Sequence, residues 1–337
     1  MGVLALDIGG AYLKAADGLG YADSQFFPLW KNRDGLIDAL RRVVDEAPQA
    51  DRLAATMTGE LADCYDSKAE GVAAILAALG EVAGPRELGI YLSDGSVVPI
   101  ATARSRPLEA GAANWHALAR FAARYVRRGG GLLLDIGSTT SDVIPLVDNA
   151  PAAVGRTDSE RMLNGELVYT GVERSPVCAV ATAFPWRGQQ CPTAHEVFAT
   201  TLDAYLILGD LPEDPSATNT ADGRPATRDA ARNRLARSIC ADRDAFSDDD
   251  AEAAAAAIAR AQAAKISVAV QGVMRRMPYP PTTIVMSGQG EFLARRLLDR
   301  LRLPADVVSL AEKLGPDVSR CATAHALAVM VREGARK

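Results

Sequence analysis

The sequence predicts an α/β protein made of two duplicated domains, with mixed sheets around a central cleft. One observation is that short β-type runs alternate with helical patterns along the chain. The second is a repeat: LALDIGG at residues 4–10 is echoed by LLLDIGS at residues 132–138, and a further strand pattern follows each copy. Two halves that open alike indicate duplication. The chain has 337 residues, 48% of them hydrophobic, which is enough to fill two hydrophobic cores.

The first copy of the repeat opens the first domain, which we place at residues 1–128. We expect these elements there, in chain order: strands at 3–6, 13–15 and 20–27, a helix at about 34–46, a strand at 53–57, a helix at 68–79, a strand at 88–92 and a helix at 115–125. Because its first strands are joined by short turns, the domain is expected to begin with an antiparallel hairpin.

The second copy follows a basic, glycine-rich break at residues 127–131. The elements expected after it are strands at 132–135 and 141–146, a polar surface or substrate loop at 210–228, an alanine-rich helix at 251–273, a strand at 283–286, and helices at 292–301 and 322–333. We therefore place the second domain at residues 129–316, with a substrate-side insertion at about 150–230. The C-terminal helix, at about 317–337, is expected to pack back on the first domain.

The charge and cysteine content favour a cytoplasmic protein with a small, charged or polar substrate, which the glycine bends described below narrow to a phosphorylated one. Lys and Arg number 37 against 42 Asp and Glu, and neither sign forms a long block. We therefore expect no nucleic-acid partner and no membrane partner, whereas a homodimer stays open. The five cysteines are scattered and odd in number, which is typical of reduced thiols. A strand pattern begins at residue 3 with no signal-peptide pattern before it, and charges interrupt the alanine-rich stretch.

Each Asp-Ile-Gly bend puts a carboxylate at the end of an apolar strand, beside small residues whose N–H groups can approach phosphate oxygens. Asp7, Asp135 and Asp142 are candidate Mg²⁺ ligands, because Mg²⁺ prefers oxygen ligands and neutralises phosphate charge. A third glycine turn, SGQG at residues 287–290, lies between an expected strand and helix. The expected phosphate contacts are Gly9, Gly10, Lys14, Gly137, Ser138, Thr139, Thr140, Ser287, Gly288 and Gly290.

A single Asp-Ile-Gly bend is also an ordinary strand ending, so the repeat is more informative than either copy. The arrangement of the two bends and the third glycine turn resembles that of the superfamily of acetate and sugar kinases, heat-shock chaperone ATPases and actin. Within it, LDIGSTTSDV at residues 134–143 resembles the Asp-x-Gly-(Gly/Ser)-Thr-Thr-x-Asp motif of the hydantoinase A/oxoprolinase family. The resemblance runs along the whole chain and implies an actin-like ATPase (ribonuclease H-like) fold.

Three further segments resemble one subgroup of that family, found in methanogens and methylotrophs: MTGELAD at 57–63, GELVYTGV at 165–172 and TADGRP at 220–225. The subgroup is linked to tetrahydromethanopterin-dependent one-carbon metabolism. The resemblance implies a transferase that joins γ-glutamyltyramine to an aminomethyl-furanmethanol diphosphate and releases diphosphate, in the making of methanofuran or its bacterial counterpart. The protein would then use a kinase fold without a kinase reaction.

That reaction needs a base to take the phenol proton of the tyramine group. Glu166 is the first candidate and Asp142 the second, because a carboxylate becomes more basic when it is partly buried in a cleft. Asp7 is expected to act beside them at the diphosphate. Glu166 is equally well read as an ordinary turn carboxylate after Asn164.

The segment around Glu166 also supplies candidate substrate contacts. Arg156 and Arg161, with Arg174 nearby, could bind the glutamyl carboxylate by paired hydrogen bonds, although each taken singly is more typical of a solvated surface arginine. Tyr169 and Thr170 complete the expected substrate-binding residues. We leave the role of a loosely spaced set of metal-ligand types, Cys178, Cys191 and His195, unassigned.

Two departures from the superfamily pattern leave the use of ATP open. Tyr12 stands where many kinases of the superfamily have a small hydroxyl residue, and the SGQG turn is a weak adenosine signature. An ATP-dependent small-molecule kinase or a hydantoinase/oxoprolinase-type hydrolase therefore competes with the transferase. A nucleotide-switched protein without catalytic activity is a further alternative, and no peptide-binding domain is visible in the sequence to support it.

Overall fold

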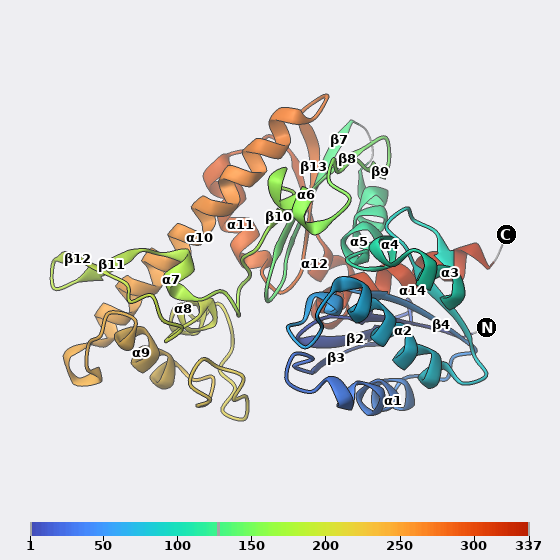
Figure 1. Ribbon diagram of the computed structural model, residues 1–337. Coiled ribbons are helices and arrows are strands. Elements are labelled where there is room, and N and C mark those ends of the chain that lie inside the picture. The colour runs from blue at the N-terminus through green and yellow to red at the C-terminus, as the bar shows by residue number, and fades with distance from the viewer. Residues whose placement is uncertain (1, 127–128, 336–337) are drawn as a thin grey trace.

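The computed structural model describes residues 2–126 and 129–335 and shows two similar α/β domains with a third lobe (Figure 1). The break predicted at residues 127–131 is described only from residue 129 onward, because residues 127 and 128 lie outside the described part. The domain boundary predicted at residues 128 and 129 therefore falls at the edge of the described residues.

The first domain is built on a six-stranded sheet in the order β3-β2-β1-β4-β5-β6. Its strands are β1 (Val3–Ile8), β2 (Tyr12–Ala16), β3 (Ala22–Phe26), β4 (Arg52–Met57), β5 (Glu87–Tyr91) and β6 (Val97–Val98). Its helices are α1 (Leu36–Glu46), α2 (Lys68–Ala83), α3 (Ile100–Ser105), α4 (Pro107–Ala110) and α5 (Asn114–Ala122). β1 pairs antiparallel with β2 and parallel with β4, so the predicted opening hairpin is confirmed.

The second domain repeats this arrangement in a sheet with the order β10-β8-β7-β13-β14. β9 also pairs with β8, outside this order. The strands are β7 (Gly130–Ile136), β8 (Ser141–Val147), β9 (Ala150–Pro151), β10 (Leu167–Val168), β13 (Pro281–Ser287) and β14 (Asp306–Ser309). β7 pairs antiparallel with β8 and parallel with β13, as β1 does with β2 and β4. This repeated topology is the actin-like fold that the sequence predicts.

Helices cover both faces of each sheet. α1 and α2 pack on the outer face of the first sheet, where Val43, Ile75 and Leu79 join β1 and β4 in one core. α14 (Ala322–Gly334) packs on the opposite face against β1 and β4. α5 and α14 lie between the two sheets, as Figure 1 shows, and their side chains also contact the second sheet. The C-terminal helix therefore lies on the first domain although it follows the second in sequence.

The outer face of the second sheet is covered by α10 (Asp248–Arg276) and α11 (Glu291–Leu301). α10 has 29 residues and begins at a capping box in which Ser247 and Asp250 bond each other's backbone. By length and composition alone this helix could cross a membrane, but over half of its most apolar window is buried inside the protein. α10 is therefore packed as a core helix.

A third lobe is inserted into the second domain. Its elements are α7 (Val177–Val180), β11 (Ala183–Trp186), β12 (Gln189–Pro192), α8 (Thr201–Leu208), α9 (Arg228–Arg237) and the first half of α10. The core of this lobe runs from Val177 to Ile258, so it ends later than the insertion predicted at about 150–230. The difference arises because the first half of α10 packs in the lobe and its second half packs on the sheet.

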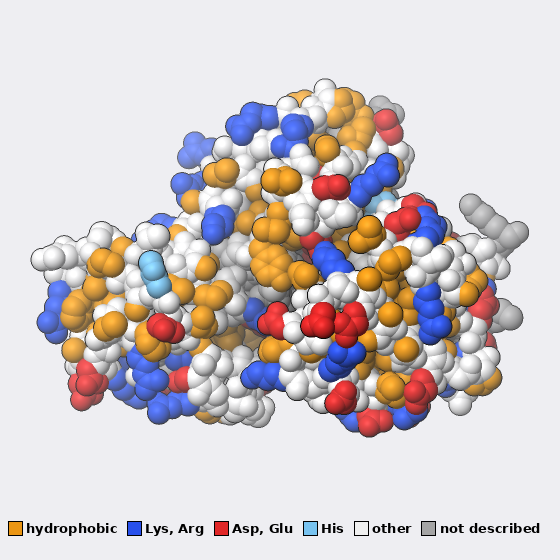
Figure 2. Space-filling model, viewed as in Figure 1, with side chains coloured by type: hydrophobic (Ala, Val, Ile, Leu, Met, Phe, Trp, Pro, Cys, Tyr) orange, Lys and Arg blue, Asp and Glu red, His pale blue; other side chains and the backbone are white. Residues whose placement is uncertain are grey.

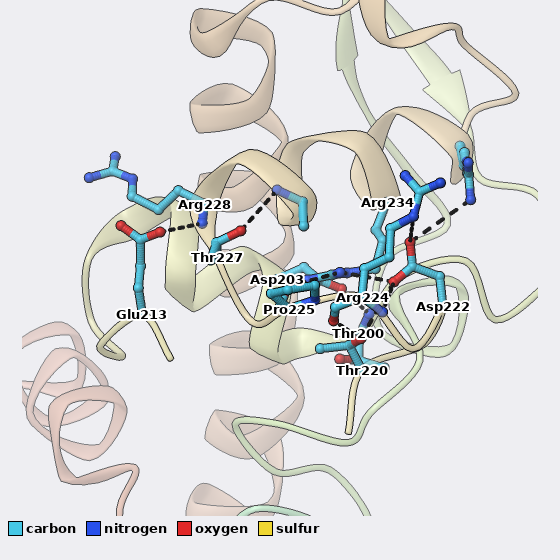
Figure 3. Close-up of polar contacts among 12 residues, drawn as sticks. Thr200, Asp203, Glu213, Thr220, Asp222, Arg224, Pro225, Thr227, Arg228 and Arg234 are labelled. Atoms are coloured by element: carbon cyan, nitrogen blue, oxygen red, sulfur yellow. Dashed lines mark hydrogen bonds and ion pairs between the residues drawn. The ribbon is translucent and has the colours of Figure 1, made fainter. Parts of the chain in front are cut away.

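A buried ion cluster holds this lobe together (Figure 3). Arg234 is fully buried and donates to Asp203 at 2.7 Å and to Asp222 at 3.0 Å. Two carboxylates around one guanidinium offset the cost of taking these charges out of water. Asp222 belongs to the segment TADGRP at residues 220–225, which therefore supports Arg234 within the lobe.

Candidate active site between the two domains

The two Asp-Ile-Gly bends have the same local geometry. In the first, the Gly9 N–H donates to the Tyr12 carbonyl at 3.0 Å; in the second, the Gly137 N–H donates to the Thr140 carbonyl at 2.9 Å. The strand after each bend returns antiparallel, which sets Lys14 opposite Asp7 and Asp142 opposite Asp135. The repeated sequence thus produces a repeated turn, with one carboxylate at the end of each central strand.

Both bends line one cleft between the domains, with a volume of about 250 Å³. The first domain contributes Gly10, Ala11, Trp30, Thr58, Leu61, Ala62, Asp63 and Asn114; the second contributes Thr139, Thr140, Asp142, Asp158, Arg161, Leu167, Tyr169 and Arg174. Figure 2 shows a hollow between the two domains, with hydrophobic, basic and acidic side chains around it. The cleft is therefore suited to a ligand that carries both apolar and charged groups.

The other side of the bends faces a smaller hollow of about 40 Å³, lined among others by Lys14, Asp135 and Ser138. It adjoins a larger hollow of about 460 Å³ that shares Tyr12 and Arg320 with it and extends to the third lobe. The two bends thus form the wall between the cleft and these hollows.

Burial makes the two bend carboxylates unusually basic. Asp7 is 6% exposed, and burial raises its pKa to about 6, although the charge of Lys14 and the side chain of Asn114 oppose the rise. The pKa of Asp135 is raised to about 7, first by burial and then by the charge of Asp142, with Lys14 opposing. Such carboxylates gain stability when a cation approaches, which is a common property of functional sites.

Asp142, at the cleft wall, is held by a buried ion network. Arg161 donates to Asp142 at 2.7 Å and to Asp158 at 3.3 Å, and its guanidinium carbon lies 4.6 Å from the centre of the Trp115 ring. Asp158 also bonds Lys68 at 3.2 Å. Burial raises the pKa of Asp142, and the charge of Arg161 opposes this rise. Arg161 is thus a fixed part of the wall.

In addition to the contact of Arg161 with Trp115, three contacts among the described residues join the domains around the cleft. Besides the ion pair of Lys68 with Asp158, the Tyr12 hydroxyl donates to Glu173 at 2.9 Å. The third is a cation–π contact in which the Arg174 guanidinium carbon lies 4.2 Å from the centre of the Trp30 ring. Because each contact pairs one domain with the other, opening of the cleft must break them.

A metal site made of all three predicted ligands is not formed. Within residues 2–126 and 129–335, no group of three or more His, Cys, Asp or Glu side chains lies close enough to hold a metal ion. Asp142 pairs instead with Arg161. Asp7 fits a cation better, because its buried Oδ1 has no hydrogen-bond partner in the described structure. Mg²⁺ is commonly bound by one or two carboxylates together with substrate phosphates, and Asp7 with Asp135 could supply these.

The other predicted phosphate and substrate contacts differ in which hollow they line. Gly10, Thr139, Thr140, Arg161 and Tyr169 line the cleft, whereas Lys14, Gly137, Ser138 and Gly288 line the small hollow behind the bends. The remaining phosphate-loop residues, Gly9, Ser287 and Gly290, line neither. Gly290 instead braces the second bend, since its N–H donates to the Ile136 carbonyl at 2.9 Å.

Glu166, the first candidate base, lies behind the cleft wall. It is 1% exposed, and its carboxylate accepts hydrogen bonds from the Val154 N–H at 2.7 Å and the Gly155 N–H at 2.9 Å. Thr170 is likewise buried and bonded to Gln262, and Arg156 is exposed outside the cleft lining. This geometry favours structural roles for Glu166 and Thr170.

Several cleft residues are absent from the sequence prediction. Trp30, Asn114 and Asp158 belong to no recognisable motif, so no sequence signal pointed to them. Asp63 lies within the segment MTGELAD, whose resemblance could have indicated it. Cys178, Cys191 and His195 take part in no cluster of three or more metal-ligand residues in the described part of the chain. Each of the five cysteines is a free thiol.

Comparison with known proteins gives matches along the chain. The family model of hydantoinase/oxoprolinase matches residues 51–333. A Methanocaldococcus jannaschii protein named (4-{4-[2-(gamma-L-glutamylamino)ethyl]phenoxymethyl}furan-2-yl)methanamine synthase is 33% identical over 98% of both chains. The Methanococcus vannielii protein of the same name is 30% identical over 60% of this chain and 90% of its own. A solved activator of 2-hydroxyisocaproyl-CoA dehydratase from Clostridium difficile aligns over 100% of this chain and 96% of its own, at 12% identity and a TM-score of 0.46.

Proposed function

We propose that this chain, which belongs to the hydantoinase/oxoprolinase family, is a condensing transferase of methanofuran or methylofuran biosynthesis. It joins γ-glutamyltyramine to an aminomethyl-furanmethanol diphosphate and releases diphosphate. The observation that carries the proposal is the full-length relative at 33% identity, whose name describes a phenoxymethyl-furan product. The cleft supports it, because residues of both bends line it together with aromatic and basic side chains.

The reaction forms one bond and breaks another. The phenol oxygen of the tyramine group bonds to the furan methylene carbon, and the bond from that carbon to the diphosphate oxygen breaks. The bonding electrons leave with the diphosphate, and the phenol proton goes to a base. The furan ring stabilises positive charge on its methylene carbon, so the enzyme must chiefly bind the leaving group and position the phenol.

The bends are the proposed diphosphate site. Lys14 supplies a positive charge there, and the small residues of both bends leave backbone N–H groups accessible to anions. We propose that Asp7 and Asp135 hold Mg²⁺ with the diphosphate, and that Asp142 does not. The metal would supply charge neutralisation for the leaving group. ATP is not needed by this reaction, and a nucleotide-dependent thermal shift would test its binding directly.

Asp142 is the proposed base. Of the two carboxylates expected to act, Asp142 lines the cleft, whereas both oxygens of Glu166 face backbone N–H groups behind the wall. Its raised pKa makes Asp142 a better proton acceptor, and Arg161 fixes its orientation. We further propose that Trp30 and Tyr169 contact the phenol ring and that Arg174 contacts the glutamyl carboxylate, because Arg161 is already engaged by two carboxylates.

Diphosphate release tests this function. We expect the purified chain to release diphosphate when γ-glutamyltyramine, the furan diphosphate and Mg²⁺ are all present. Asp7→Asn and Asp135→Asn should each lower kcat by about 10²–10³-fold, the usual range for loss of one group that stabilises developing charge. Asp38→Asn, at an exposed site on α1, is the matched control. Absence of diphosphate release from the wild type with both substrates would refute the proposal.

The remaining features of the proposal are those of a small-molecule enzyme. We place it in the cytoplasm, where its free thiols would remain reduced. The reaction calls for no nucleic-acid or membrane partner, and it is compatible with either a monomer or a homodimer.

A further inference from the structure

Glu60 is a buried carboxylate without a partner. It lies in the short 3₁₀ turn Gly59–Leu61 that follows β4 and is 1% exposed. Neither of its carboxylate oxygens has a hydrogen-bond partner in the described structure. A buried carboxylate without a partner is strongly unfavourable when it is ionised, so a cationic ligand group would stabilise its charged form.

The carboxylate is held in a fixed position by close backbone packing. A Cβ placed on Gly111 would come within 3.1 Å of Glu60 Oε1, and the backbone of Glu60 lies against Gly71 of α2. The side chain is therefore closely packed as well as buried. It lines a hollow of about 220 Å³ formed by both domains, together with Lys68, Pro107, Leu108, Gly111, Ala112, Thr157, Asp158 and Ser159.

The charges around this hollow leave one negative charge unbalanced. The linked groups comprise three carboxylates, Glu60, Asp158 and Asp142, and two cations, Lys68 and Arg161. Lys68 and Arg161 both pair with Asp158, and Arg161 also pairs with Asp142, so Glu60 remains without a cation. When Glu60 is ionised, the hollow is therefore one positive charge short, and Pro107 and Leu108 make part of its lining apolar.

The hollow is connected to the proposed reaction site. Asp158 lines both the hollow and the cleft, and Leu61 and Ala62, which follow Glu60, line the cleft. On the other side of Glu60, Gly59 packs against Gly9 of the first bend. The hollow therefore lies beside the cleft, next to the first bend.

We propose that the Glu60 hollow is a binding subsite for a primary ammonium group on a small apolar stem. Building on the proposed function, this group is the aminomethyl end of the furan substrate, whose diphosphate end lies at the bends. Glu60 pairs with the ammonium, and the Thr157 and Ser159 hydroxyls lie in the same lining for its remaining hydrogens. Glu60 is a specificity residue, since it rejects neutral furans.

The pH dependence of binding follows from the same groups. Burial raises the pKa of Glu60 to about 7; the charge of Asp158 adds to this rise, whereas nearby backbone N–H groups and Lys68 oppose it. An ammonium ligand pairs with the ionised form, so binding releases a proton from Glu60 below that pKa. We therefore expect the affinity for the amine to increase from pH 5.5 to pH 8, where the amine itself stays protonated, and to fall at higher pH as the amine loses its proton.

Calorimetric titration of the full chain with furfurylamine, and separately with furfuryl alcohol, tests the subsite. We expect the wild type to bind furfurylamine more tightly at pH 8 than at pH 5.5, and to bind furfuryl alcohol weakly at both. Glu60→Gln keeps the shape of the side chain but should raise the Kd for furfurylamine about tenfold or more and abolish its pH dependence. Glu81→Gln, an exposed position on α2, is the matched control and should bind as the wild type does.

The outcomes separate the subsite from the reaction. Lack of furfurylamine binding to the wild type, or unchanged binding to a folded Glu60→Gln variant, would overturn the subsite even if diphosphate release is observed. Binding that depends on Glu60 in a chain that releases no diphosphate would support the ammonium subsite and refute the condensing activity. If both the subsite and the condensing activity are observed, Glu60→Gln should mainly raise the KM for the furan substrate. The reason is that Glu60 binds the end of the substrate that is remote from the reacting carbon.

Discussion

The guanidinium of Arg161 donates a hydrogen bond of 2.7 Å to the carboxylate of Asp142, and both side chains are almost fully buried in the cleft wall. The sequence predicts these residues separately, one as a substrate contact and the other as a metal ligand or base. Their pairing gives Asp142 a cation from within the protein. It also explains why the metal is better sought at Asp7 and Asp135.

Arg161→Met should destabilise the protein by about 3–5 kcal/mol near neutral pH, because it leaves the buried Asp142 without its cation. Urea unfolding measures the free energy of unfolding. The exposed Arg156, five residues earlier, provides the control Arg156→Met, which should stay within about 0.5 kcal/mol of the wild type. Equal stability of the two variants would show that the ion network contributes little.

Glu166→Gln should lower stability more than it lowers turnover. Both oxygens of Glu166 accept backbone N–H groups, and the Gln amide nitrogen cannot accept, so one N–H loses its partner at a cost of about 1–3 kcal/mol. We expect kcat of the folded variant to stay near that of the wild type. If instead kcat falls by orders of magnitude with unchanged unfolding, Glu166 and not Asp142 is the base.

Asp7→Asn should make the protein less active but more stable at high pH. The folded pKa of Asp7 is about 6 against an ordinary value of 3.8, so its contribution to stability is full below pH 3.8 and is lost as the pH rises through 6. The variant escapes this loss and should be more stable than the wild type at pH 8 by on the order of 3 kcal/mol. Thermal unfolding from pH 4 to pH 8 checks this, with Asp38→Asn as the control. A constant difference across that range would contradict the raised pKa.

Gly288→Ala should disrupt the second bend. Gly288 has a φ of +83°, and an added Cβ would lie 2.4 Å from the Ile136 carbonyl oxygen and 2.8 Å from Asp135 Oδ1. We expect a loss of stability of more than about 2 kcal/mol and a loss of diphosphate release. Gly209→Ala, at a φ of +74° with open space around the Cβ, isolates the backbone strain and should cost on the order of 1 kcal/mol. A similar loss of stability in both variants would contradict this prediction, because it would show that the second bend shifts to make room for the added Cβ beside Asp135.

The fold was predictable because its signals are local. The two bends are short patterns of an apolar strand, a carboxylate and glycine, and their repetition implies two domains of the same topology. The same locality limits the prediction of the third lobe: α10 continues unbroken from the lobe to the second sheet, so no sequence signal marks where the lobe ends.

The sequence by itself thus determined the duplicated architecture, the bends and the family resemblance. Only the tertiary structure decided that Glu166 is buried among backbone N–H groups and that Asp142 pairs with Arg161. It also decided that the Trp30 ring contacts Arg174, and that the carboxylate of Glu60 has no hydrogen-bond partner among the described residues. The physical reason is that a strand or turn is specified by neighbouring residues, whereas the partner of a buried charge is set by segments far apart in the chain. The chemistry of this cleft therefore depends on contacts that no local pattern encodes.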